Sequence, residues 1–190
     1  PVAAAIAARL DGHLSTADLG GYAARLREPL RFGYRGLTVE TMPPPSAGGV
    51  ALAVLLLELA RQRAHELVPG SVLDLHLFLE ASRRAQIERR LRVVDPDRLG
   101  PELLARRLAE WTDPERPLPG TVPIDRTRVT PSATLHPLYG ELLREAEHTT
   151  HYSVVDADGM AVSVTTTLSA GFGSRIVVPG TGVLLNNEMD

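Results

Sequence analysis

One stretch decides the fold and the chemistry that this sequence predicts: Thr149-Thr150-His151-Tyr152-Ser153-Val154-Val155-Asp156. Side chains of a strand point to opposite faces in turn, so residues 152, 154 and 156 share one face and residues 151, 153 and 155 the other. Asp158-Gly159 supplies a tight turn, and residues 161–168 return as a second alternating run. We therefore expect a β-hairpin whose first strand begins at Thr149.

The position of Thr149 also indicates a chemistry. A turn-rich, proline-rich segment precedes it, and cleavage there would leave a threonine with both a hydroxyl and a free α-amine. An α-amine has a pKa of about 7.7–8.0, so near neutral pH part of it can accept the hydroxyl proton. This pairing activates a weak nucleophile. Spacing alone, however, favours an ordinary strand threonine, because threonine is a good β-former.

Longer motifs extend the stretch and add a second, separate one. They lie at 149–156, 158–159, 161–167, 172–174 and 179–190, and at 42–49, which reads Met-Pro-Pro-Pro-Ser-Ala-Gly-Gly. Together they closely resemble the γ-glutamyltranspeptidases, or glutathione hydrolases, which are N-terminal nucleophile hydrolases. The resemblance runs with gaps from about Leu10 to Asp190 and is weakest between about Pro69 and Leu135.

The resemblance implies a fold and a division of the chain. The fold would be α+β, as part of the αββα four-layer sandwich of N-terminal nucleophile hydrolases. Residues 1–148 would be the C-terminal part of the large-subunit region, ending in a proline-rich linker at 112–137. Residues 149–190 would begin the small catalytic subunit. Both ends look like cuts, so we expect an internal fragment that spans the junction between large and small subunits.

The resemblance also assigns roles to residues. Thr149 corresponds to the nucleophile and self-processing point, with the implied cleavage between His148 and Thr149. Thr167 corresponds to a threonine that hydrogen-bonds the nucleophile and assists it. Glu188 corresponds to a residue that holds the α-amino group of the donor, and a carboxylate suits an ammonium partner. Ser169 replaces an asparagine that helps to bind the donor, and this departure leaves the acyl specificity open.

The activity implied is ping-pong acyl transfer from γ-glutamyl amides, with glutathione as donor and water, an amino acid or a peptide as acceptor. The large and small subunits of one precursor would be partners, without a cofactor or metal. Parts of the donor site and oxyanion hole lie outside this segment, so the fragment alone should be inactive. Alternatives are a cephalosporin-type acylase, a poly-γ-glutamate depolymerase, or an unprocessed, non-catalytic homologue. By analogy, the location would be periplasmic or extracellular in a bacterium.

Composition excludes several other classes. The 190 residues carry a net charge of −3, which argues against a nucleic-acid binder. All 20 basic residues are arginine, so no lysine can act as a base, and the absence of cysteine removes thiolate chemistry. No run reaches the ~18 apolar residues of a membrane span. The six histidines lack metal-ligand spacing, and His151 is interpreted as structural.

The remaining periodicity predicts the other elements. A capping box at 15–18 opens one helix, residues 43–49 form a loop, and no regular element is expected between 112 and 137. Arg83-Arg84 and Arg89-Arg90 are interpreted as a solvated helix face. Helices are expected at 2–10, 17–26, 50–66, 71–94, 101–111 and 138–147, and further strands at 30–35, 36–42, 176–178 and 182–185.

Overall fold

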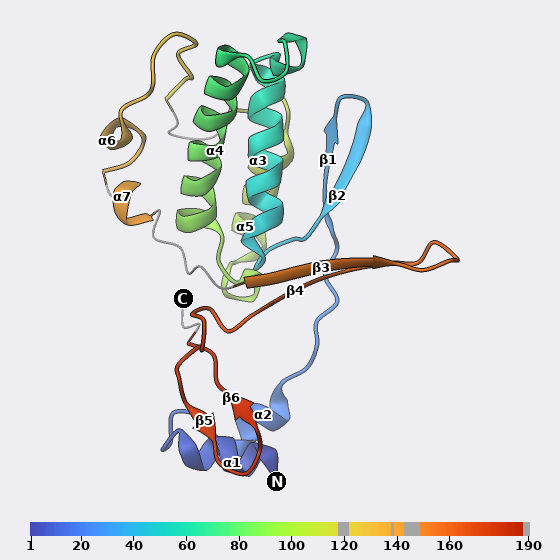
Figure 1. Ribbon diagram of the computed structural model, residues 1–190, viewed down its shortest axis with the longest axis vertical. Helices are drawn as coiled ribbons and strands as arrows, with labels where there is room; N and C mark the ends of the chain where they lie inside the picture. Colours follow the sequence, from blue (N-terminus) through green and yellow to red (C-terminus); the bar gives the residue numbers. More distant parts are fainter. Residues whose placement is uncertain (118–121, 138, 143–148, 188–190) are drawn as a thin grey trace. The chain divides into compact units, whose positions relative to one another are not determined.

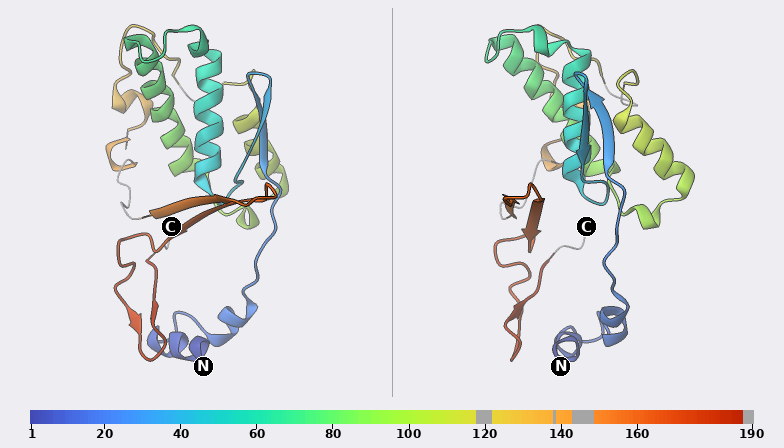
Figure 2. Two further views of the ribbon diagram at one scale, coloured as in Figure 1. Left: turned by 45° about the vertical axis from the view of Figure 1, so that its right-hand side comes forward. Right: turned by 90° about the vertical axis from the view of Figure 1, so that its right-hand side faces the viewer.

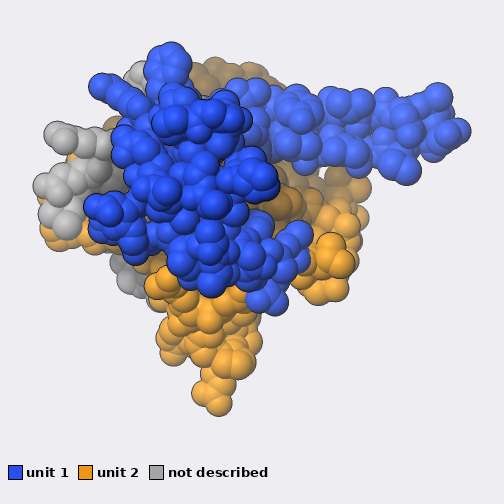
Figure 3. Space-filling view, turned by 90° about the horizontal axis from the view of Figure 1, so that it is seen from below, with its two compact units in different colours: residues 1–25, 145–190 blue, residues 26–144 orange. Residues whose placement is uncertain are grey.

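A computed structural model describes residues 1–117, 122–137, 139–142 and 149–187. The chain forms two compact units, one of residues 26–144 and one of residues 1–25 with 145–190 (Figure 3). The two units are defined by which residues contact each other in space. The boundary predicted at 148/149 is instead defined by an expected cleavage of the chain. That boundary therefore stays a prediction.

The unit of residues 26–144 is built around two neighbouring helices, α3 (Ala47–Arg61) and α4 (Val72–Arg92) (Figure 1). A 3-10 turn, η1 (Ala64–Glu66), lies between them in the chain. Strands β1 (Leu30–Tyr34) and β2 (Leu37–Thr41) form an antiparallel hairpin, and β1 packs against α3 and α5 (Figure 2). α5 spans Pro101–Thr112 and follows the short turn η2 (Pro96–Arg98).

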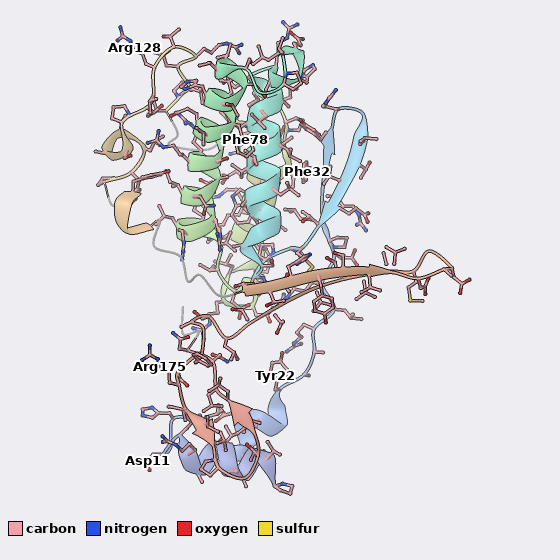
Figure 4. All side chains as sticks on the ribbon, in the orientation of Figure 1. Asp11, Tyr22, Phe32, Phe78, Arg128 and Arg175 are labelled. Atoms are coloured by element: carbon pink, nitrogen blue, oxygen red, sulfur yellow. The ribbon has the colours of Figure 1, made fainter. Side chains whose placement is uncertain are left out.

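The core of this unit lies on one face of α3. Its buried residues recur three and four positions apart, so they form one stripe, which packs on β1, α4 and α5. Figure 4 labels Phe32, whose ring β1 turns toward α3. The buried residues of this core are Leu30, Phe32, Val50, Ala53, Val54, Leu57, Ala85 and Trp111.

α3 begins at Ala47, inside the segment predicted to be a loop, and ends at Arg61 rather than at residue 66. Gly49 lies in the first turn of this helix, next to the end of β2. A Cβ at Gly49 would lie 2.0 Å from the Met42 carbonyl oxygen, so the first turn of the helix can approach the end of β2 only with glycine there. Gly49, predicted to lie in a loop, instead permits a close contact inside a helix.

The inner face of α4 is charged, which corrects the interpretation of its arginines as a solvated face. Arg84 and Glu80 are each only 1% exposed, and Arg84 Nη1 lies 2.8 Å from Glu80 Oε2. Arg83 Nη1 binds the other oxygen of Glu80 at 2.7 Å. Thr130 donates its hydroxyl to Glu80 Oε2 at 2.5 Å and its N–H to Oε1 at 3.2 Å. These four residues form a buried ion-pair cluster.

This cluster fastens the proline-rich segment to the helices. Arg84 Nη2 donates to the Val122 carbonyl at 2.7 Å, and Arg126 Nη1 donates to the Gln62 carbonyl at 2.7 Å. Ile124 is buried against α4. A short helix, α6 (Ser132–Leu135), also forms here, so the prediction that 112–137 holds no regular element is wrong.

Helix α7 (Tyr139–Leu142) follows α6. It lies within the helix predicted at 138–147. Residues 138 and 143–147 of that predicted helix lie outside the described residues.

The other unit carries the N-terminal helices and the predicted hairpin. α1 (Val2–Arg9) packs next to α2 (Thr16–Gly21), whose capping box between Ser15 and Asp18 is confirmed. α2 ends at Gly21 instead of residue 26, because Gly20-Gly21 is a poor helix former and Tyr22 is extended. The strands are β3 (Thr149–Val155), β4 (Ala161–Thr167), β5 (Val177–Val178) and β6 (Val183–Leu184).

The predicted α+β class is confirmed. The described strands form three two-stranded antiparallel sheets, β1–β2, β3–β4 and β5–β6, beside the helices. This composition is consistent with a partial N-terminal nucleophile hydrolase sandwich. No helix within the described ranges is long and apolar enough to cross a bilayer.

Candidate active site

The register of the β3–β4 hairpin places Thr149 directly opposite Thr167. The turn sets this register. Asp156 donates its N–H to the Met160 carbonyl at 3.0 Å, and its Oδ1 accepts the N–H groups of Asp158 at 3.0 Å and Met160 at 2.8 Å. Gly159 takes φ +85°, which glycine adopts without strain. A slip of one residue would turn every side chain to the other face, so this turn decides which threonines meet.

Within this register the two hydroxyls are in contact. Thr149 Oγ1 donates to Thr167 Oγ1 at 3.2 Å. The Thr167 oxygen also accepts the Ser169 N–H at 2.9 Å. Ser169 holds φ +72°, a left-handed conformation that is uncommon outside glycine. Ser169 therefore contacts Thr167 through its backbone, which leaves its side chain available for another partner.

An open depression of about 470 Å³ lies beside this pair. Threonines of β3 and β4 and the small residues after β4 line it, so its wall presents hydroxyls and accessible backbone. Such a wall suits a polar ligand of small size. The lining residues are Thr149, Thr150, Thr166, Thr167, Leu168, Ala170 and Gly171.

His151 lies on the same strand face as Thr149, two residues further along. Its Nδ1 is 2.7 Å from Thr165 Oγ1, and its Nε2 is 3.1 Å from Ser163 Oγ. Ser153 Oγ in turn lies 3.1 Å from Ser163 Oγ. These bonds join β3 to β4, which fits the structural role predicted for this histidine.

A residue that sequence reasoning missed lies next to this site. Asn187 donates its backbone N–H to the Leu168 carbonyl at 3.2 Å, and its Oδ1 accepts the Ala170 N–H at 2.9 Å. The segment before it is held close to Gly173, where a Cβ would lie 2.2 Å from the Leu185 carbonyl oxygen. The Asn-Asn-Glu motif draws attention to Glu188, and only the fold brings Asn187 to the pocket wall.

The structure brings together Thr149, Thr167 and Ser169, three of the five residues singled out for the site. His148 and Glu188 lie outside the described residues. Across the described ranges, no three histidine, aspartate or glutamate side chains are grouped so that they could hold a metal ion. The geometry therefore assembles a threonine pair beside a polar pocket.

The comparisons with known proteins agree with these motifs. The family model described as "Gamma-glutamyltranspeptidase" matches residues 2–190, and the chain belongs to that family. The glutathione hydrolase proenzyme of Pseudomonas aeruginosa is 39% identical over 182 residues, which cover 94% of this chain and 31% of the relative. The acylase ACY 1 proenzyme of Pseudomonas sp. (strain SE83) is 33% identical over 180 residues, covering 94% and 30%.

Among solved structures, the crystal structure of Helicobacter pylori γ-glutamyltranspeptidase matches with a TM-score of 0.49 and 27% identity. The match covers 72% of this chain and 38% of that one. The chain thus spans about a third of the length of the relatives that it matches.

Proposed function

We propose that the full-length gene product hydrolyses and transfers γ-glutamyl groups, with Thr149 as its nucleophile. The observation that carries this proposal is the contact of the Thr149 and Thr167 hydroxyls at 3.2 Å beside a polar pocket. Membership of the γ-glutamyltranspeptidase family supports it. Glutathione is the proposed donor, and water, an amino acid or a peptide amine the acceptor.

The first step is self-cleavage between His148 and Thr149. The Thr149 oxygen bonds to the carbonyl carbon of residue 148 while the C–N bond to Thr149 breaks. The hydroxyl proton passes to the released amine, and the product is an ester. Water then cleaves the ester, which frees the Thr149 hydroxyl beside the α-amine already released and leaves a carboxylate on residue 148. The two resulting chains, a large and a small subunit, are the proposed partners.

Turnover repeats the same chemistry on a donor. The α-amine, with a pKa of about 7.7–8.0, accepts the Thr149 proton as the oxygen attacks the γ-carbonyl. The leaving amine takes that proton, and an acyl ester remains until water or an acceptor amine attacks it. Thr167 holds the Thr149 oxygen in position. Glu188 would hold the α-amino group of the donor, Ser169 would help to bind the donor, and no cofactor or metal is proposed.

The test is an intact mass of the full-length protein and of Thr149→Ala. Two fragments that meet at 148/149 in the wild type, and one uncut chain in the variant, are the expected result. Thr150→Ala is the matched control, since Thr150 is the neighbouring hydroxyl on the opposite strand face. An uncut wild-type chain would contradict the mechanism and favour a non-catalytic homologue. Cell fractionation tests the further proposal of a periplasmic or extracellular location.

A second candidate is acylase activity on a different acyl group. Ser169 stands where the family's donor-binding asparagine is expected, and an acylase is among the relatives at 33% identity. Serine is shorter than asparagine and offers one hydroxyl in place of an amide. A panel of γ-glutamyl amides, poly-γ-glutamate and cephalosporin side-chain amides would separate the two. Higher kcat/KM for a non-glutamyl amide would favour the acylase.

A further inference from the structure

The side chain of Asn187 joins two parts of the site that are distant in sequence. Its Oδ1 accepts the Ala170 N–H at 2.9 Å. Ala170 directly follows Ser169, and Asn187 directly precedes Glu188. One hydrogen bond therefore connects the neighbours of the two residues that the proposed function assigns to donor binding.

The hydrogen bond of the Asn187 side chain fixes the orientation of this segment, which the backbone hydrogen bond of Asn187 alone does not. Asn187 also donates its N–H to the Leu168 carbonyl at 3.2 Å. A single hydrogen bond leaves two segments free to rotate about it, whereas two bonds, to residues 168 and 170, hold both register and rotation. Ala170 and Leu168 both line the pocket beside Thr149.

The residues that precede Asn187 are held by separate hydrogen bonds. The Leu185 carbonyl accepts both the N–H and the hydroxyl of Ser174, each at 3.0 Å. Leu185 donates its own N–H to the Ile176 carbonyl at 3.0 Å. The segment thus reaches residue 187 from an ordered support, and the Asn187 side chain is the contact that aligns it with the pocket wall.

We propose that Asn187 is a positioning residue of the donor site, which holds the pocket wall at residues 168–170, and with it Ser169, in place beside Thr149. This inference rests on the proposed function. It predicts a particular division of effects. Self-cleavage needs Thr149 and Thr167 but no donor, so loss of the Asn187 side chain should spare self-cleavage and raise the KM for the donor.

The experiment compares three variants of the full-length protein. Asn187→Leu keeps the branched shape, the number of side-chain heavy atoms and the backbone bond, but removes the acceptor oxygen. Asn187→Asp keeps an oxygen facing the Ala170 N–H. Thr181→Val is the matched structural control, because the Thr181 hydroxyl makes two comparable bonds within the β5–β6 turn, to the Val178 carbonyl at 2.9 Å and from the Val183 N–H at 3.1 Å.

Two readouts are taken: the rate of self-cleavage by mass, and kcat and KM for glutathione on the cleaved protein. For Asn187→Leu we expect KM to rise about 3- to 10-fold, the worth of one hydrogen bond, with self-cleavage within about twofold of wild type. Asn187→Asp should show a KM at or below the wild-type value. Thr181→Val should leave both readouts near wild type.

Three outcomes would overturn the inference. One is an unchanged KM in Asn187→Leu, and another is a self-cleavage rate that falls in parallel with the rise in KM, which would indicate a general structural role. The third is failure of Asn187→Asp to restore KM. A wild-type protein that does not act on glutathione would instead show that the proposed function has failed, and the inference would fall with it.

Discussion

Replacing Glu80 tests the buried ion-pair cluster that fastens the proline-rich segment to α4. Burial alone would raise the pKa of Glu80, but hydrogen bonds from Thr130, Arg84 and Arg83 outweigh it and lower the pKa from 4.5 to about 2. This difference of pKa between unfolded and folded states corresponds to about 3 kcal/mol of stability at neutral pH. Because the folded pKa is the lower one, the contribution is present above pH 4.5 and lost as pH falls through 2.

The change is Glu80→Gln, which keeps the size of the side chain and removes its charge. It leaves Arg84, 1% exposed, without its carboxylate, so we expect a loss of about 3 kcal/mol in the free energy of unfolding at pH 7. Near pH 3 the gap between wild type and variant should shrink to about 1–2 kcal/mol, because Glu80 is then mostly protonated in the unfolded state and still mostly ionised in the folded state, so proton uptake on unfolding stabilises the unfolded wild type.

The assay is urea unfolding of the full-length protein at pH 7, 5, 4 and 3, with amide hydrogen exchange of residues 122–132 at pH 7. The matched control is Glu66→Gln, which removes an exposed carboxylate whose partner, Arg63, is also three positions away in sequence. That exposed pair should be worth under about 1 kcal/mol. A loss in Glu80→Gln no larger than in the control, or a gap that is the same at pH 7 and pH 3, would refute this account of the cluster.

Three further predictions concern single contacts. Thr167→Val should slow self-cleavage by roughly 10- to 100-fold, whereas Thr166→Val on the opposite face should not; equal mass-spectrometric rates would count against the pairing with Thr149. Trp111→Phe removes the hydrogen bond from Trp111 Nε1 to the Glu88 carboxylate at 2.7 Å. It should lower the free energy of unfolding in urea by about 2–3 kcal/mol, and a decrease of less than about 1 kcal/mol would contradict this prediction. Gly173→Ala should speed hydrogen exchange at 183–187 more than Gly180→Ala, since only the former meets a backbone atom; similar exchange would argue against that close contact.

Local sequence was sufficient for the elements whose signals lie within a few residues. The capping box at Ser15 and Asp18 starts α2 as predicted, and Ser71 begins α4 in the same way, by accepting the Asp74 N–H. The alternating pattern around Asp158-Gly159 was enough to predict the β3–β4 hairpin and its first residue. Motif order was enough for the family. These features depend on periodicity and turn chemistry, which are short-range properties.

Contacts between distant residues were decided by the tertiary structure. Four arginines in the eight residues 83–90 of α4 suggest a solvated face, yet Arg84 is buried because the Val122 carbonyl and Thr130, 38 and 46 residues away, complete its hydrogen bonds. The same holds for Asn187, whose partner Ala170 lies 17 residues earlier. A buried charged group or side-chain amide is stable only where the fold brings all its hydrogen-bond partners to it. The sequence around any one of these residues does not show which distant residues those partners are.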